Sequence, residues 1–146
     1  MAAVELNYPE TRYRTTSLAD LTSRSTRERL SPAAAKAFFN IVDRWRIRTE
    51  DARALAGGIS NGPYYTWKKT PTRILDPDLL TRISYLVGIF KALNILYGEK
   101  LADEWVRLPN RNRIFGGQTP LEYMIRGGVP AMQIVRRLLD ARCGGM

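Results

Sequence analysis

Basic and polar residues gather between residues 49 and 73, where short helices and glycine turns are expected. The segment "ARALAGGISNGPYYTWKK" joins one short helix to another through Gly57 and Gly58. Two helices joined by a short glycine-containing turn are typical of a helix-turn-helix, whose second helix enters the DNA major groove. The chemistry predicted here is hydrogen bonding to base edges and ion pairing with phosphates.

The first residues of the second helix would meet the bases, and the flanking cations would meet the phosphates. Asn61 has the side chain best suited to adenine, because its amide both donates and accepts. The predicted DNA-binding residues are Arg53, Ser60, Asn61, Gly62, Tyr64, Tyr65, Lys68, Lys69 and Arg73. Ile59 and Trp67 are expected to point inwards. The alternative is an ordinary bend between two core helices.

A second candidate is the glycine-rich stretch "NRNRIFGGQTPLEYMIRGG", residues 110–128. A phosphate-binding loop needs its glycines between a strand and a helix, followed in the P-loop form by a lysine and a hydroxyl. That context is missing. We interpret these glycines as turns, with Thr119 capping a short helix whose first residue is Pro120.

Composition favours a binding protein. The 146 residues carry a net charge of +9 and no histidine, so an anionic partner is plausible. No nucleophile has a recognisable base beside it, and the adjacent carboxylates Asp103 and Glu104 diverge on a helix, so we expect no enzyme activity, metal or cofactor.

The single Cys143 and the lack of a secretory signal fit the cytoplasm. The apolar stretch "ISYLVGIFKALNILYG" is expected to be too short to span a membrane.

Helical periodicity predicts a series of helices after a polar N-terminal segment. Residues 1–30 are expected to be a flexible basic arm. The first helix is predicted to begin at Ser31 with Pro32 in its first turn, and the longest to run over about 79–97. The last begins near Pro130 and is expected to bury Ile134, Val135, Leu138 and Leu139.

The C-terminal third carries a specific set of motifs. They stand at Trp105, Pro109-Asn110, Phe115-Gly116-Gly117, Thr119-Pro120-Leu121, Gly128 and the apolar ladder Val135, Leu138 and Leu139. With them, this region resembles the toxin-binding domain of the Xre/MbcA/ParS antitoxin family. Residues 31–97 resemble the Xre-type helix-turn-helix that precedes it, chiefly through "ALAGGIS" and "TWKK". We interpret Trp105 as a core residue.

The resemblance implies an all-α fold in which residues 31–97 form a helix-turn-helix domain and residues 98–146 a toxin-binding domain. It also implies a type II antitoxin that covers the active site of an NAD-degrading RES-domain toxin and represses its own operon. The implied partners are the toxin and operator DNA, with the antitoxin a homodimer. A thin glycine-rich tail suits a concave pocket, and arginines suit acidic groups at its mouth. The predicted toxin-binding residues are Arg136, Arg137, Leu139, Asp140, Arg142, Cys143, Gly144, Gly145 and Met146. A frayed C-terminal end is the alternative for the tail.

Two other functions stay open from the residues alone. One is a plain helix-turn-helix regulator whose C-terminal helices only dimerise it. The other, more remote, is a nucleotide-handling enzyme that uses the glycines.

Overall fold

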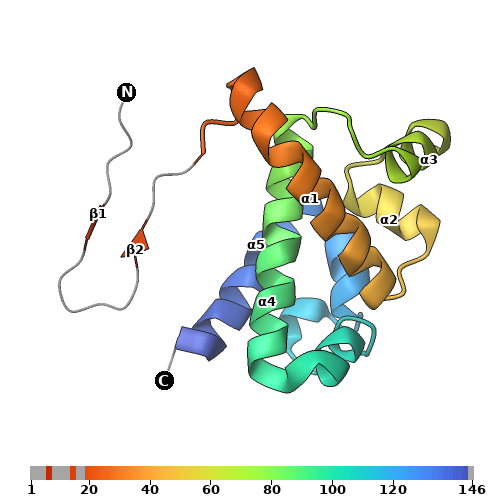
Figure 1. Ribbon diagram of the computed structural model, residues 1–146. Coiled ribbons are helices and arrows are strands. Elements are labelled where there is room, and N and C mark those ends of the chain that lie inside the picture. The colour runs from red at the N-terminus through yellow and green to blue at the C-terminus, as the bar shows by residue number, and fades with distance from the viewer. Residues whose placement is uncertain (1–5, 8–13, 16–18, 145–146) are drawn as a thin grey trace.

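The longest apolar stretch forms the helix around which the others pack. A computed structural model describes residues 6–7, 14–15 and 19–144, and in it helix α4 spans Pro77–Trp105. It begins as its sequence predicts: the carboxylate of Asp76 accepts a hydrogen bond from the Leu79 N–H at 2.8 Å, and Pro77 occupies the first turn. Helices α1 (Arg24–Arg44) and α5 (Pro120–Gly144) both pack against α4 (Figure 1).

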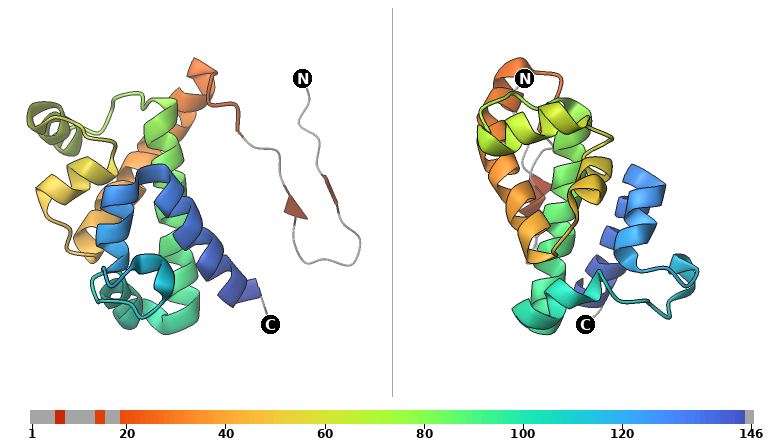
Figure 2. Two further views of the ribbon diagram at one scale, coloured as in Figure 1. Left: turned by 180° about the vertical axis from the view of Figure 1, so that it is seen from behind. Right: turned by 90° about the vertical axis from the view of Figure 1, so that its right-hand side faces the viewer.

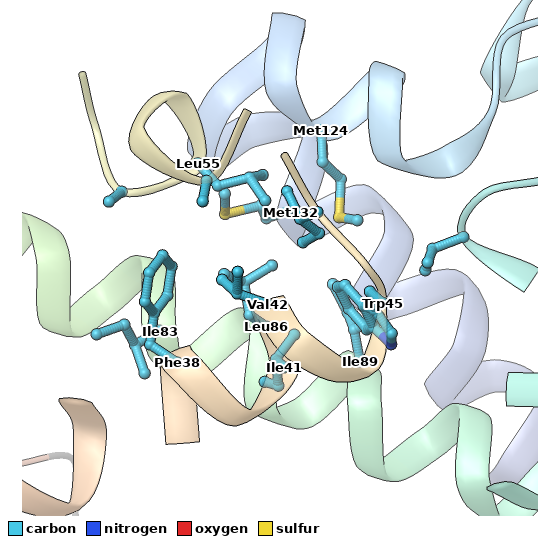
Figure 3. Packing of buried hydrophobic residues seen from close by; sticks show 14 of the residues in the cluster. Phe38, Ile41, Val42, Trp45, Leu55, Ile83, Leu86, Ile89, Met124 and Met132 are labelled. Carbon is cyan, nitrogen blue, oxygen red and sulfur yellow. The ribbon is translucent and has the colours of Figure 1, made fainter. Parts of the chain in front are cut away.

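One hydrophobic core joins these helices. Phe38 and Val42 from α1 meet Leu86 from α4, and Met124 and Met132 bring in α5 (Figure 3). All of these side chains are buried, Phe38 and Met132 completely. Because burial of apolar surface is the main favourable contribution to folding, α1 and α5 stabilise one another through this core.

The smaller elements lie around this core. Helices α2 (Thr49–Leu55) and α3 (Asn61–Lys69) project to one side, as two views agree (Figures 1 and 2). A 3-10 helix, η1 (Arg113–Phe115), lies in the connection between α4 and α5. Near the N-terminus, β1 (Leu6–Asn7) and β2 (Arg14–Thr15) form a short antiparallel pair in the register Leu6 to Thr15. The predicted all-α class is confirmed, with only this two-residue pairing besides helices among the described residues.

Helix α1 begins earlier than predicted. Its N-cap is Ser23, whose hydroxyl accepts from the Thr26 N–H at 3.4 Å, so residues 24–30 are helical and do not belong to an arm. The proline that suggested a helix start, Pro32, lies inside α1, next to a Ser31 that is bonded on both sides. Its hydroxyl donates to the Arg27 carbonyl at 2.6 Å and accepts from the Leu75 N–H at 2.8 Å. Residues 1–5, 8–13 and 16–18 of the predicted arm lie outside the described residues.

Two glycines break the long helices. Gly98 (φ 76°, ψ 165°) interrupts α4, and Gly128 (φ 64°, ψ −146°) interrupts α5. Both have positive φ, which glycine adopts without steric cost. The predicted end of the longest helix near residue 97 and the predicted stop at Gly128 are therefore confirmed as breaks, although the helical backbone resumes after each.

Helix α4 as a whole is long and apolar enough, by length and composition alone, to cross a membrane, although the apolar stretch within it was expected to be too short. The core helix of a soluble protein passes the same test. Leu86, Ile89 and Leu93 of α4 are at most 1% exposed and form part of the core. Packing between α1 and α5 thus accounts for the buried apolar face of α4, whereas Ile95 and Leu101 are exposed.

Candidate DNA-binding and partner-binding surfaces

The turn between α2 and α3 is rigidly held. Gly57 (φ 99°) and Gly58 (φ 88°) carry the chain through a left-handed stretch that other residues rarely adopt. The Gly58 N–H donates to the Arg53 carbonyl at 2.8 Å, and the Arg53 Nε donates back to the Ile59 carbonyl at 2.8 Å. These reciprocal bonds fix the angle at which α3 leaves α2.

Helix α3 buries one face against α1. Tyr64 and Trp67 are each 1% exposed. The Trp67 ring stacks on Phe38 with centroids 5.3 Å apart, and Tyr64 packs edge-on against Phe39 at 5.8 Å. Burial, with the nearby Asp43 carboxylate as a smaller cause, raises the pKa of Tyr64.

The opposite face of α3 is free to meet a ligand. Tyr65 is 52% exposed, and the other exposed residues predicted to bind DNA are Ser60, Asn61, Gly62, Lys68, Lys69 and Arg73. Ser60 occupies the N-cap position without a side-chain capping bond. The start of α3 therefore presents the hydroxyl of Ser60 and the amide of Asn61 on one surface, with the cations at its C-terminal end.

One of the predicted DNA contacts is corrected by the structure. Tyr64 was placed at a base edge, which was wrong, because its side chain lies in the core. Arg53 is half-buried, and its Nε donates to the Ile59 carbonyl of the glycine turn, so its contact with a phosphate stays a prediction.

The second half of α5 forms the other candidate surface. Met132, Val135 and Leu139 are buried against α4, whereas Arg137 and Asp140 are exposed. The prediction that Leu139 contacts a partner was wrong, since it is fully buried. Ile134, predicted to be buried, is 38% exposed and adds an apolar side chain to this surface.

The end of α5 is ordered by contacts with α4. Arg142 donates to the Tyr97 hydroxyl at 3.1 Å, and half-buried Cys143 lies with its Sγ 3.8 Å from the Ala92 carbonyl. Helix α5 continues to Gly144, which is exposed. A thin tail beginning at residue 142 is therefore corrected to a last helical turn. Gly145 and Met146 lie outside the described residues.

The glycine-rich stretch before α5 forms turns, as expected. Asn110 and Asn112 accept hydrogen bonds from N–H groups two residues ahead, at 2.9 and 3.1 Å. The Thr119 hydroxyl caps α5 by accepting from the Glu122 N–H at 3.1 Å. Beside this stretch Trp105, only half-buried, packs edge-on against the buried ring of Phe115. The interpretation of Trp105 as a core residue is therefore confirmed only in part.

Arg82 is a functional candidate that sequence reasoning missed. Its guanidinium binds the Asp78 carboxylate at 2.8 Å and donates to the Leu55 carbonyl at 3.4 Å, at the end of α2. It also lies within van der Waals reach of the position that a Cβ would take at Gly128. One side chain thus contacts the helix-turn-helix and the break in α5. The i, i+4 spacing of Asp78 and Arg82 was the available signal.

The adjacent carboxylates Asp103 and Glu104 have different surroundings. Asp103 pairs with Arg44 of α1 at 2.9 Å, whereas Glu104 is exposed, so the two carboxylates diverge as predicted. Within the described part of the chain, no three His, Cys, Asp or Glu side chains lie close enough together to hold a metal ion.

Comparison with known proteins identifies two domains in the chain. Residues 27–88 match the antitoxin Xre-like helix-turn-helix domain, and residues 92–145 match the antitoxin Xre/MbcA/ParS C-terminal toxin-binding domain. The chain is also 40% identical over 115 residues to the uncharacterized protein y4oB of Sinorhizobium fredii, in a match that covers 78% of this chain and 87% of that protein. Both matched families are binding and regulatory proteins rather than enzymes. The chain therefore belongs to the Xre-type antitoxins, with a helix-turn-helix domain followed by a toxin-binding domain.

Proposed function

We propose that this antitoxin neutralises an NAD-degrading RES-domain toxin by covering its active site, and that it represses its own operon as a DNA-bound homodimer in the cytoplasm. The observation that carries the proposal is the separation of the two candidate surfaces. Helix α3 and the C-terminal end of α5 lie at opposite ends of the molecule in both views (Figures 1 and 2). One chain can therefore hold DNA and a toxin at the same time.

The chemistry of α3 supports the DNA part of the proposal. Asn61 is exposed at the start of the helix, where a recognition helix meets base edges. Lys68 and Lys69 are exposed at its end, and Arg73 follows. These cations would neutralise phosphates, a contribution to affinity that does not depend on base sequence. A single module of this size is too small for high selectivity, which favours a dimer on a two-fold operator.

The chemistry of α5 supports the toxin part. Arg137 and Arg142 are exposed, and Ile134 supplies an apolar contact beside them. A helix surface with an apolar centre and arginines around it is typical of protein interfaces. We propose that residues 130–144 of α5 make most of the toxin contact and that the chain beyond them reaches the toxin pocket.

The DNA proposal is tested by footprinting on the native promoter. We expect Lys68→Ala with Lys69→Ala to weaken binding to all sequences and to reduce the slope of log K against log salt by about 0.9 for each phosphate that is no longer neutralised. Asn61→Ala should change base preference and leave the salt slope unchanged. Lys91→Ala is the matched control, because Lys91 is exposed on α4, away from α3. A native footprint with all three α3 substitutions present would show that α3 is not the reading helix.

The toxin proposal is tested by co-expression with the product of the neighbouring gene. We expect the two proteins to co-purify and the complex to leave NAD intact, whereas the isolated toxin degrades it. Co-purification with a partner that has no effect on NAD would contradict the RES assignment. Failure to bind any neighbouring product would favour the plain regulator.

A further inference from the structure

A pocket of about 500 Å³ lies between the two matched domains, away from the exposed face of α3. The connection between α1 and α2 supplies Arg46 and Arg48, the segment after α4 supplies Arg107, and the first half of α5 supplies Arg126. Its apolar lining comes from Ile47, Leu121 and Ile125, of which Ile47 is 8% exposed and the others half-buried. A volume of this size is in the range of small-molecule sites.

The charges around this pocket are not balanced within it. Arg48 pairs with Asp51 at 3.3 Å. Arg46, Arg107 and Arg126 form no ion pair with any residue that the structure describes. Against four arginines the lining holds two carboxylates, Asp51 and Glu122. Convergence of like charges on a concave surface raises the local concentration of counter-ions.

Arg46 also occupies a backbone position where glycine is favoured. Its φ is 53°, and it is the one described non-glycine residue with a positive φ. Its N–H donates to the Asp43 carbonyl at 3.1 Å, and the Ile47 N–H donates to the Val42 carbonyl at 2.9 Å. This is the Schellman arrangement at the end of α1, in which the left-handed residue is usually glycine. A side chain retained at the cost of backbone strain points to a function for that side chain.

We propose that this pocket binds a small phosphate-bearing molecule, held by the guanidinium groups of Arg46, Arg107 and Arg126. Guanidinium matches phosphate geometry and binds it through paired hydrogen bonds. A phosphate monoester carries about 1.5 to 2 negative charges near neutral pH, which suits the excess of two arginines better than the single charge of a carboxylate does. The lining by Ile47, Leu121 and Ile125 receives the organic part. Because both matched domains contribute, the bound molecule bridges them.

The test is calorimetric titration of the full-length antitoxin with inorganic pyrophosphate at low salt. We expect one site per chain and an affinity about tenfold weaker in Arg46→Gly and in Arg107→Gln, each of which removes charge-assisted hydrogen bonds. Arg46→Gly should also raise the melting temperature, because glycine relieves the positive φ. Arg29→Gln, exposed on α1 outside the pocket, is the matched control and should bind as the wild type does.

Three results would overturn the proposal. Equal affinity in all four proteins would show that pyrophosphate follows net charge alone. No measurable binding to the wild type would exclude the pocket as a phosphate site. Weaker toxin binding by Arg107→Gln, with no pyrophosphate binding by the wild type, would assign the arginines to an acidic segment of the toxin instead. None of these results bears on operator recognition by α3.

Discussion

At the residue scale, Tyr64 and Tyr65 show how one helix separates structural from ligand-facing side chains. Tyr64 lies three residues before Trp67 and shares its buried face, while Tyr65 points away from the core and is 52% exposed. Neighbours on a helix are rotated by about 100°, so adjacent residues with the same ring reach different surroundings. The raised pKa of Tyr64 follows from that burial.

This contrast predicts opposite effects for the two substitutions. Tyr65→Ala should weaken operator binding while changing the free energy of unfolding by less than about 0.5 kcal/mol, as is usual for exposed residues. Tyr64→Ala should lower the free energy of unfolding by about 3 to 5 kcal/mol, because removal of a buried aromatic ring leaves a cavity. Urea unfolding and gel-shift titration measure the two effects. Unchanged operator affinity in Tyr65→Ala would mean that this face of α3 does not touch DNA.

The burial of Tyr64 was available from the sequence. Trp67 was expected to point inwards, and a spacing of three residues places Tyr64 on the same helical face. The role of Arg53 was not available, because its bond to the Ile59 carbonyl depends on the path of the turn. Local spacing could have identified the buried face of α3, whereas partners across a turn required the folded backbone.

At the element scale, the contact between α4 and α5 depends on a glycine. The guanidinium of Arg136 crosses α4 at Gly88, and a Cβ on Gly88 would overlap it. Arg136 is held there by Asp140 at 2.9 Å, one turn along α5. A nearby bond from Gln133 to the Tyr85 hydroxyl at 3.0 Å joins the same two helices. Gly88 thus sets where Arg136 lies on the proposed toxin-binding helix.

Gly88→Ala should therefore separate stability from toxin binding. Alanine favours helix by about 1 kcal/mol over glycine, which offsets the displacement of a flexible, partly exposed arginine, so the melting temperature should change little. Toxin affinity should fall to the level of Arg136→Ala, because the guanidinium can no longer cross α4. Paired measurements of melting and toxin affinity provide the check. Full toxin affinity in Gly88→Ala would show that the position of Arg136 is unimportant.

Element boundaries were predictable where local signals acted alone. Thr119 caps α5, and Lys69 ends α3, as the sequence indicates. The start of α1 was missed at Ser23, which caps the helix locally by accepting from the Thr26 N–H. Ser31, which was predicted to cap it, instead accepts from the Leu75 N–H, which lies far along the chain. Long-range hydrogen bonds of this kind leave no trace in helical periodicity.

At the scale of the whole molecule, the two matched domains share one core. Trp45 and Leu55, from the helix-turn-helix side, belong to the same buried cluster as Met124 and Met132 of α5 (Figure 3). Arg82 donates to the Leu55 carbonyl and lies close to Gly128, so it also connects the two sides. The domain boundary that was placed near residue 97 stays a prediction. The sequence indicated the helix-turn-helix and toxin-binding regions. It did not indicate that their helices share one core, because that depends on packing across α4.

The shared core also determines what the C-terminal end contributes. Arg142 and Cys143 contact Tyr97 and Ala92 of α4, so the last turn of α5 has a structural role as well as an exposed face. A deletion that begins at residue 142 removes these contacts, whereas one that begins at residue 145 keeps them. The two truncations therefore distinguish anchoring of the helix from entry into a toxin pocket.

Deleting residues 142–146 should lower the free energy of unfolding by about 1 to 2 kcal/mol, because one hydrogen bond is removed and a small apolar contact becomes partly exposed. Deleting only residues 145–146 should leave unfolding and operator binding unchanged, because the last turn of α5 stays in place. If the end of the chain obstructs the toxin pocket, the shorter deletion should keep much of the toxin affinity while NAD degradation returns in the complex. Complete silencing of the toxin by the shorter deletion at equal concentration would instead assign inhibition to the surface of α5 around Arg137.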